Sequence, residues 1–280
     1  MGIVDQRKWS CRGRQVAFDP PAVMGIVNVT PDSFSDGGQH ATTDAAVDHA
    51  LRLVREGAAI VDIGGMSTRP GAADVSVQEE IDRVVPVVRR LVAACDVTVS
   101  VDTFRAEVAR AALAAGAHAV NDVLPFDGQS EMAAVVREYQ AGLVVMHSRG
   151  TPRSMDGLTA YSDLVAEVEA TLDAAVAFAE RNGISRDQVV IDPGLGFAKT
   201  VEQNLELLRA TARFAERAPV LIGASRKRFV GAICGVEQAC LRDAGSHACA
   251  LFAISQGASI VRVHDVKGMV ESIKMWRSLC

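Results

Sequence analysis

The sequence predicts an α/β fold, a single closed (β/α)8 or TIM barrel, and three observations support this prediction. The chain has 280 residues, which suits one barrel of about 250 residues. Hydrophobic residues make up 49% of it and charged residues 22%, so a large core can be buried. Short β-branched runs alternate with helical patterns eight times, as in parallel strands joined by helices, whereas an open doubly wound sheet usually has fewer strands.

Each expected strand is a short run rich in valine or isoleucine, followed by polar or turn-forming residues. In chain order the strands are expected at Val23–Val29, Ala59–Ile63, Val97–Val101, Ala117–Val120, Gly142–Met146, Gln188–Ile191, Pro219–Gly223 and Ser259–Val263.

The expected helices are the longer stretches, rich in Ala, Leu, Val and Glu, between these strands. They cover Thr43–Arg55, Val77–Ala94, Arg105–Ala115, Ser130–Gln140, Tyr161–Asn182, Val201–Glu216, Arg242–Gln256 and Val266–Leu279. Three of them are followed by Gly116, Gly183 and Gly257, and glycine tolerates the left-handed conformation that commonly ends a helix.

Residues 1–21 are expected to form an N-terminal extension of one domain that spans residues 1–280. Residues 5–21 are expected to fold as a small hairpin or plug ahead of the first barrel strand. No low-complexity stretch or repeat beyond the βα unit divides the chain.

Charge and composition narrow the possible partners and compartment. The chain has 29 basic and 34 acidic residues, a net charge of −5, so no overall positive field attracts nucleic acid or an anionic membrane. Residues 1–14 carry charges and a tryptophan where a signal peptide needs an apolar core, and no run reaches the roughly 18 apolar residues of a membrane span. The six cysteines show no metal or CxxC spacing. We expect a cytoplasmic protein that acts on small molecules.

Polar residues follow every expected strand, and in such barrels the chemistry lies at the carboxyl ends of the strands. Taken singly, each of them is slightly better explained as a turn residue or helix cap than as a functional group. Turns and caps do not readily explain why all eight strands would place polar groups at the same face of the barrel. In strand order the groups are Asn28 with 30–38, Asp62 with 67–71, Asp102, Asn121 with Asp122, His147, Asp192, 225–228, and Arg262 with His264.

Two sets can be separated by charge. Asp102, Asn121, Asp192 and Lys227 are suited to a flat heterocycle, because a carboxylate such as Asp192 can pair in bidentate fashion with a ring N–H and its neighbouring amino group.

The second set is cationic. Arg69, Arg262 and His264, with the helix start after Ser225-Arg226, are suited to phosphate oxygens. Asn28 and Asp36 supply hard oxygen ligands that suit Mg²⁺ bound to a diphosphate. The expected ligand is therefore a heterocycle that carries phosphates.

The motifs themselves resemble those of dihydropteroate synthases. Residues 24–38, MGIVNVTPDSFSDGG, are similar to the first signature of that family nearly residue for residue. Further blocks match in order: 62–71, 100–103, 121–123, 146–147, 191–197, 225–227 and 262–266. The resemblance covers essentially the whole chain after residue 20.

The resemblance implies a barrel, usually homodimeric, that condenses 6-hydroxymethyl-7,8-dihydropterin diphosphate with p-aminobenzoate in folate biosynthesis. The products would be 7,8-dihydropteroate and diphosphate, Mg²⁺ would be the cofactor, and sulfonamides would be inhibitors. We expect a dissociative displacement, in which the aromatic amine needs no strong base and the cationic groups stabilise the leaving diphosphate.

The resemblance also implies residue roles. The pterin would be held by Asp102, Asn121, Asp192 and Lys227, with Met146 and Phe197 lining its slot. The diphosphate would be held by Asn28, Arg262 and His264, with Mg²⁺ near Asn28 and Asp36. The aminobenzoate would be covered by Phe34, Thr68, Arg69 and Pro70. The residues expected to act in catalysis are Asn28, Asp36, Arg69, Lys227, Arg262 and His264.

Two departures from the family pattern leave alternatives open. Met66 stands where the family often has Glu, and Ser148 follows His147 where Met or another residue is common. Met66 adjoins the second loop, so its effect falls on aminobenzoate or sulfonamide affinity. The alternatives are a pterin-binding methyltransferase barrel, which needs no diphosphate cluster, and a paralogue that binds pterin phosphates without condensing them.

Overall fold

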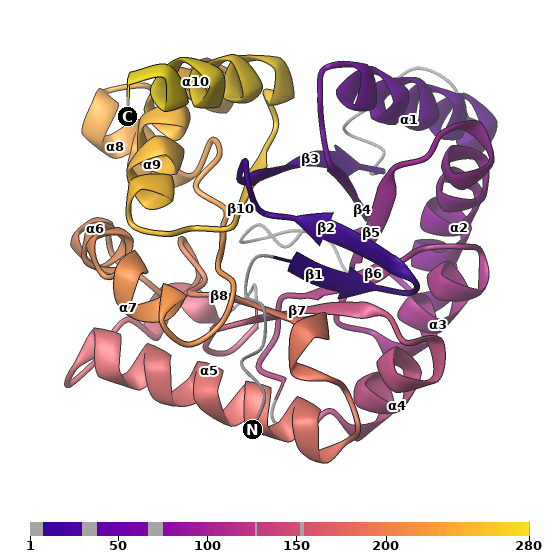
Figure 1. The fold of residues 1–280 in the computed structure, drawn as a ribbon, viewed down its shortest axis with the longest axis horizontal. Coiled ribbons are helices and arrows are strands. Elements are labelled where there is room, and N and C mark those ends of the chain that lie inside the picture. Colours follow the sequence, from indigo (N-terminus) through magenta and orange to yellow (C-terminus); the bar gives the residue numbers. More distant parts are fainter. Residues whose placement is uncertain (1–7, 30–37, 67–74, 127, 152–153, 280) are drawn as a thin grey trace.

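Eight parallel strands form the barrel in a computed structural model that describes residues 8–29, 38–66, 75–126, 128–151 and 154–279 (Figure 1). The sheet runs in the order β8-β7-β6-β5-β4-β3-β10-β9, and a parallel bridge between Ile191 and Val220 joins its two edges. The predicted barrel is therefore confirmed. Its strands are β3 (Ala22–Asn28), β4 (Ile60–Gly64), β5 (Thr98–Asp102), β6 (Ala119–Asp122), β7 (Gly142–Met146), β8 (Val189–Asp192), β9 (Leu221–Ile222) and β10 (Ile260–Val263).

Helices surround the barrel in Figure 1. They are α1 (Gly38–Arg55), α2 (Val77–Ala94), α3 (Ala106–Ala114), α4 (Ser130–Tyr139), α5 (Leu164–Arg181), α6 (Val201–Arg209), α7 (Thr211–Ala215), α8 (Arg228–Cys234), α9 (Asp243–Ser255) and α10 (Val266–Leu279), with 3-10 turns at Met155–Gly157, Arg186–Gln188 and Ala239–Leu241. Each glycine expected to end a helix, at 116, 183 and 257, has a positive φ. Within the described part of the chain, no helix is both long and apolar enough to cross a membrane.

Several helical predictions were wrong in detail; α1, for example, begins at Gly38 rather than at Thr43. The stretch expected as one helix over residues 201–216 is two, α6 and α7, because the chain leaves the helix at Ala210 and the Thr211 hydroxyl donates to the Leu208 carbonyl at 2.8 Å. The helix expected from Tyr161 begins at Leu164, because Asp163 caps it by accepting from the amide of Ala166 at 3.0 Å. The start of α8 was expected after Ser225-Arg226, but the extent of this short helix was not predicted.

A hairpin of β1 (Lys8–Cys11) and β2 (Arg14–Ala17) closes the amino-terminal end of the barrel, as expected for the N-terminal extension. Trp9 is fully buried, and its indole N–H donates to the Gln188 carbonyl at 2.7 Å. A side chain at Gly142 would approach Trp9 and Cys11 to within 2.8 Å, so the hairpin lies directly on β7.

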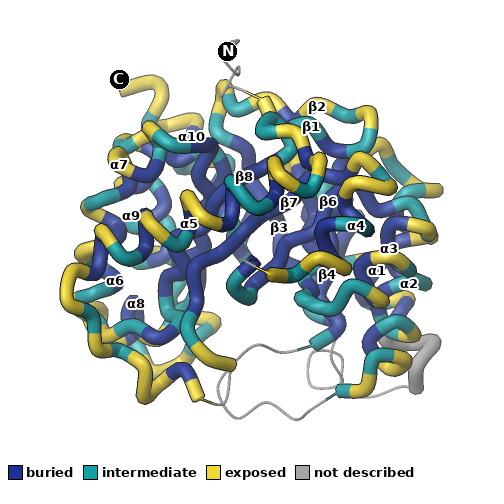
Figure 2. Tube along the Cα trace, turned by 90° about the horizontal axis from the view of Figure 1, so that it is seen from below, coloured by how far each residue is buried: buried dark blue, intermediate teal, exposed yellow. Residues whose placement is uncertain are grey.

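The barrel has two hydrophobic cores, because alternate strand residues face opposite sides of the sheet. The inner core joins Trp9 to inward residues such as Met24, Ile60 and Val144, whereas outward residues such as Val61 pack against the helices. Figure 2 shows the strands as the buried interior and exposed positions on the helices and the hairpin. Since the hairpin fills one end, the opposite end, where the strands finish, is available for chemistry.

Candidate active site

Polar side chains gather at the carboxyl ends of the barrel strands. The hydrogen-bonded register places Asn28 beside Gly64, Gly64 beside Asp102, and Asp102 beside Asn121, so four neighbouring strands reach the same height. On the next pair of strands, Met146 lies beside Asp192. The rim expected from strand positions is thus continuous from β3 to β8.

Arg262 is the centre of an ionic network at this rim. Its Nε donates to Asp62 Oδ2 at 2.6 Å and its Nη2 donates to Asp102 Oδ2 at 2.7 Å. The amide of Asn121 donates to the same Asp62 Oδ2 at 3.0 Å. Asp62 is fully buried. The sequence places Asp102 in the set suited to the heterocycle and Arg262 in the cationic set. In the structure the two side chains form an ion pair, because opposite charges attract strongly in a buried site.

Burial controls the protonation of this network. It raises the pKa of Asp102 to about 7, against the opposing effect of Arg262, and the neighbouring Asp62 raises it further. Burial likewise raises the pKa of Asp122 to about 7, although one of its oxygens accepts from the amide of Leu124 at 3.0 Å. The other oxygen of Asp122 has no hydrogen-bond partner among the described residues.

Asp192 and Lys227 influence each other electrostatically in the neighbouring part of the rim. Burial raises the pKa of Asp192, whereas the charge of Lys227 acts to lower it. Burial lowers the pKa of Lys227 to about 8, and Asp192 acts against this. The Lys227 ammonium donates to the Leu195 carbonyl and lies 4.8 Å from the centroid of the Phe197 ring. The lysine therefore covers the loop that follows β8.

His264 is joined to the loop after β9. Ser225 Oγ accepts from the backbone N–H of His264 at 3.1 Å and lies 2.9 Å from its Nδ1. These two contacts to one hydroxyl hold the imidazole of His264 against the loop after β9. Arg226, by contrast, pairs in bidentate fashion with Asp243 at 2.7 Å, which holds it to α9 rather than to a ligand.

The donors present suit a magnesium ion bound mainly through a ligand. Asn28 ends β3 and offers one amide oxygen at the rim. Among the described residues, no group of three His, Cys, Asp or Glu side chains could hold a metal. Mg²⁺ is usually bound by one or two protein oxygens plus water and phosphate, so Asn28 fits this mode.

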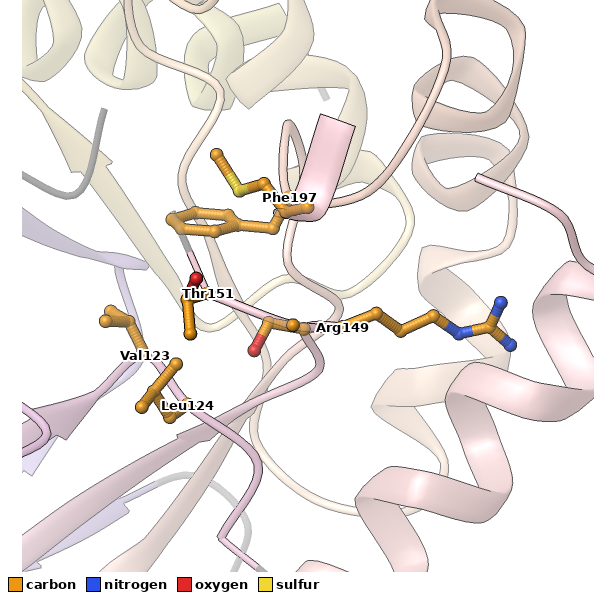
Figure 3. A pocket seen from close by; sticks show the side chains of 8 residues that line it. Val123, Leu124, Arg149, Thr151 and Phe197 are labelled. Atoms are coloured by element: carbon orange, nitrogen blue, oxygen red, sulfur yellow. The ribbon is translucent and has the colours of Figure 1, made fainter. Parts of the chain in front are cut away.

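An apolar pocket lies beside Phe197 (Figure 3). Val123 and Leu124, from the loop after β6, face Phe197 from the loop after β8, with Thr151 between them. Arg149 extends away from the pocket and stacks on the Tyr161 ring at 3.6 Å. Phe197, which the sequence places in the pterin slot, therefore lines an apolar pocket between the loops after β6 and β8.

Sequence reasoning missed several residues of this site. Asp62 was noted as a strand end but given no role; it lies beside Ser100, two residues before the level of Asp102, and Arg262 reaches both aspartates. Lys199, which donates to His147 Nδ1 at 3.0 Å, had no signal in the sequence because it lies in a loop. The predicted residues Phe34, Asp36, Thr68, Arg69 and Pro70 lie outside the described residues.

The barrel and its rim define a class, the pterin-binding barrel enzymes, and comparison with known families agrees. The family model described as "Pterin binding enzyme" matches residues 24–264. That match spans the barrel from β3 to the start of the loop after β10 and includes every described residue of the site.

Individual relatives narrow the class. The chain is 45% identical over 260 residues to a dihydropteroate synthase of Synechocystis sp., covering 91% of this chain and 90% of the relative. It is 43% identical over 271 residues to the Escherichia coli enzyme of the same name, covering 96% of this chain and 95% of the relative. The chain belongs to the dihydropteroate synthase family.

Solved structures agree in fold. The Xanthomonas albilineans dihydropteroate synthase with 4-aminobenzoic acid is 47% identical, with a TM-score of 0.91 over 98% of both chains. The structure of the same protein in complex with 7,8-dihydropteroate is 44% identical to this chain, with a TM-score of 0.88 over 97% of this chain and 98% of that one. A Yersinia pestis dihydropteroate synthase with a sulfonamide drug is 40% identical, with a TM-score of 0.90 over 97% of this chain and 98% of that one.

Proposed function

We propose that this protein condenses 6-hydroxymethyl-7,8-dihydropterin diphosphate with p-aminobenzoate, giving 7,8-dihydropteroate and diphosphate in folate biosynthesis. The observation that carries the proposal is the buried network of Arg262, Asp62, Asp102 and Asn121 at the strand ends. Family membership and the dihydropteroate bound by a relative 44% identical to this chain support it.

The pterin pocket is proposed to consist of Asp102, Asn121, Asp192 and Lys227, with Met146 and Phe197 on its walls. A flat heterocycle with N–H groups on one edge suits Asp192 and Asp102 as acceptors, because buried carboxylates make strong bonds to paired N–H donors. Lys227 balances their charge and supplies a donor for a ring acceptor.

The diphosphate is proposed to bind between Asn28, Arg262 and His264. The two aspartates hold the guanidinium of Arg262 in place. Its Nη1 makes no hydrogen bond to the described residues, so the two N–H groups of Nη1 are proposed to donate to the diphosphate. His264 is oriented by Ser225, whose hydroxyl contacts both its backbone N–H and its Nδ1. Both groups would stabilise negative charge as the C–O bond breaks.

Magnesium is proposed as the cofactor, held by Asn28 and by Asp36. When bound, Mg²⁺ neutralises charge on the diphosphate and assists its departure. Phe34, Thr68, Arg69 and Pro70, on the first two loops, are proposed to cover the aminobenzoate and exclude water that would otherwise capture the cationic methylene. The aromatic amine is largely unprotonated at pH 7, so no general base is required.

A homodimer is proposed from exposed apolar side chains on one side of the barrel. They are Ile233 on α8, Leu241 just before α9, Phe252 on α9 and Met275 on α10, exposed by 54%, 65%, 43% and 59%. These elements neighbour one another in Figure 1. Large exposed apolar residues on adjacent elements commonly mark a subunit interface. Light scattering should give twice the chain mass, and Phe252→Asp should lower it.

A cytoplasmic location is proposed as well. The cysteines that the structure describes, at 11, 95, 234, 240 and 249, are all free thiols, which suits a reducing compartment.

The direct test of the reaction is an assay of diphosphate release with components omitted in turn. Release should require dihydropterin diphosphate, aminobenzoate and Mg²⁺ together, stop with EDTA and resume when Mg²⁺ is restored. Release without aminobenzoate at the same rate would mean simple hydrolysis and would overturn the proposal. Methyl transfer to a corrinoid would point instead to the methyltransferase alternative.

A further inference from the structure

Lys199 lies in the loop between β8 and α6 and contacts both walls of the pterin pocket. Its ammonium donates to His147 Nδ1 at 3.0 Å, to the Gly194 carbonyl at 2.9 Å and to the Phe197 carbonyl at 2.9 Å. His147 directly follows Met146 at the end of β7, whereas the two carbonyls belong to the loop that begins at Asp192. One side chain thus joins the ends of two neighbouring strands.

The loop from residue 193 to 198 is also held from other elements, because the Asn204 side chain accepts from the amide of Gly196 at 2.5 Å and the Tyr161 hydroxyl donates to the Ala198 carbonyl at 3.1 Å. Gly194 has φ +72°, and a Cβ there would lie 1.9 Å from the His147 carbonyl oxygen. The loop therefore packs backbone to backbone against the end of β7.

The charge of Lys199 matters for this contact. Burial lowers the pKa of Lys199 to about 7, Asp192 opposes this, and Lys227 and Arg149 lower it further. An ammonium has three N–H donors, and all three find an acceptor here, whereas a neutral amine has only two. Burial, reinforced by Lys199, lowers the pKa of His147 to about 3, so its imidazole is neutral and Nδ1 accepts.

We propose that Lys199 is a positioning residue for pterin binding: it fixes the loop after β8 against the end of β7 and thereby places Asp192 and Phe197. The inference rests on the proposed function, because it concerns the same pocket. Lys199 acts through these residues and through the orientation of His147, whose imidazole proton it directs to Nε2.

The test compares Lys199→Met, Lys199→Arg and the control Lys274→Met, which removes an exposed lysine of α10. Calorimetry with 6-hydroxymethyl-7,8-dihydropterin should show affinity reduced at least about tenfold in Lys199→Met, because misplacement of a binding group costs affinity steeply. Lys199→Arg should recover part of it. The KM for p-aminobenzoate should change less than about twofold.

A purely structural role gives a different pattern. In that case Lys199→Met would melt at a lower temperature, yet its folded fraction would bind pterin as the wild type does, and the proposal would be overturned. If the wild type neither binds pterin nor condenses it, the proposed function fails instead, so the two failures are distinct.

A second measurement uses the wild-type protein and does not depend on the folding of any variant. Long-range ¹⁵N NMR of the imidazoles, assigned with His147→Gln, should show His147 neutral at pH 5 to pH 6, where Lys199 is charged, with its proton on Nε2. A proton on Nδ1 would contradict the donation from Lys199 and the positioning role with it.

Discussion

Arg262 and Asp62 are 200 positions apart in the chain, and the Nε of the arginine donates to a fully buried oxygen of the aspartate at 2.6 Å. The same oxygen accepts from Asn121, and the arginine also reaches Asp102. One ion pair therefore orders both the proposed pterin contacts and the proposed diphosphate contacts. A substitution at this pair should affect stability and catalysis together.

Arg262→Ala should slow condensation by about a hundredfold, as expected for loss of a donor to a leaving anion. It should also cost about 3–5 kcal/mol of stability at pH 8, because two buried carboxylates lose their counterion. The loss should be smaller at pH 5, where Asp102, whose pKa is already raised to about 7, is protonated. Urea unfolding at both pH values measures this, and equal losses would contradict the network.

Asp192→Asn should reduce pterin affinity by about a hundredfold, because a bidentate carboxylate is replaced by an amide with one acceptor. Calorimetry with 6-hydroxymethyl-7,8-dihydropterin measures the change. Asp173→Asn is the matched control, since Asp173 pairs with Arg217 on the surface. Near-normal affinity in Asp192→Asn would remove Asp192 from the pterin pocket.

Asp122→Asn should stabilise the protein at pH 8 but not at pH 4. Burial raises the pKa of Asp122 to about 7 from 3.8, so the folded state holds a proton that the unfolded state has lost between these values. Stability of the wild type therefore falls as the pH rises from about 4 to about 7, by about 4 kcal/mol at most from this residue. Denaturation curves across this range should be flatter for the variant. Identical slopes would show that Asp122 is ionised in the folded protein.

Trp9→Ala should cost about 3–5 kcal/mol without changing the condensation rate of the folded enzyme. Trp9 fills the inner core at the amino-terminal end of the barrel, opposite the site, and also donates to the Gln188 carbonyl. Trp276 on α10 is only partly buried, so Trp276→Ala is the control variant for the loss of stability and for the rate. A fall in rate equal to that of a pocket variant would mean that the plug reaches the active site.

Much of the fold could be predicted from sequence because buried parallel strands are continuous apolar runs with polar residues at or near their carboxyl ends. Asn28, Asp102, Asn121 and Asp192 were found by that position alone. Only the start of α8 could be predicted, because seven residues with a glycine inside carry little helical pattern.

Contacts across the barrel could not be predicted. Arg262 was assigned to phosphate by its charge, but the register of β10, β3, β4 and β5 decides that it meets Asp62 and Asp102. Lys199 and His147 meet only because two loops pack together. Charge and strand position thus identify which residues form the site, while the partner of each depends on the three-dimensional packing.

Single-turnover mixing tests the central claim most directly. Excess wild-type protein with Mg²⁺ is combined with dihydropterin diphosphate and p-aminobenzoate, and both products are quantified. Dihydropteroate and diphosphate should form in equal amounts, and neither should form with Asp192→Asn at the same concentration. Pterin that binds but yields no dihydropteroate would instead identify a protein that holds pterin phosphates without joining them to the amine.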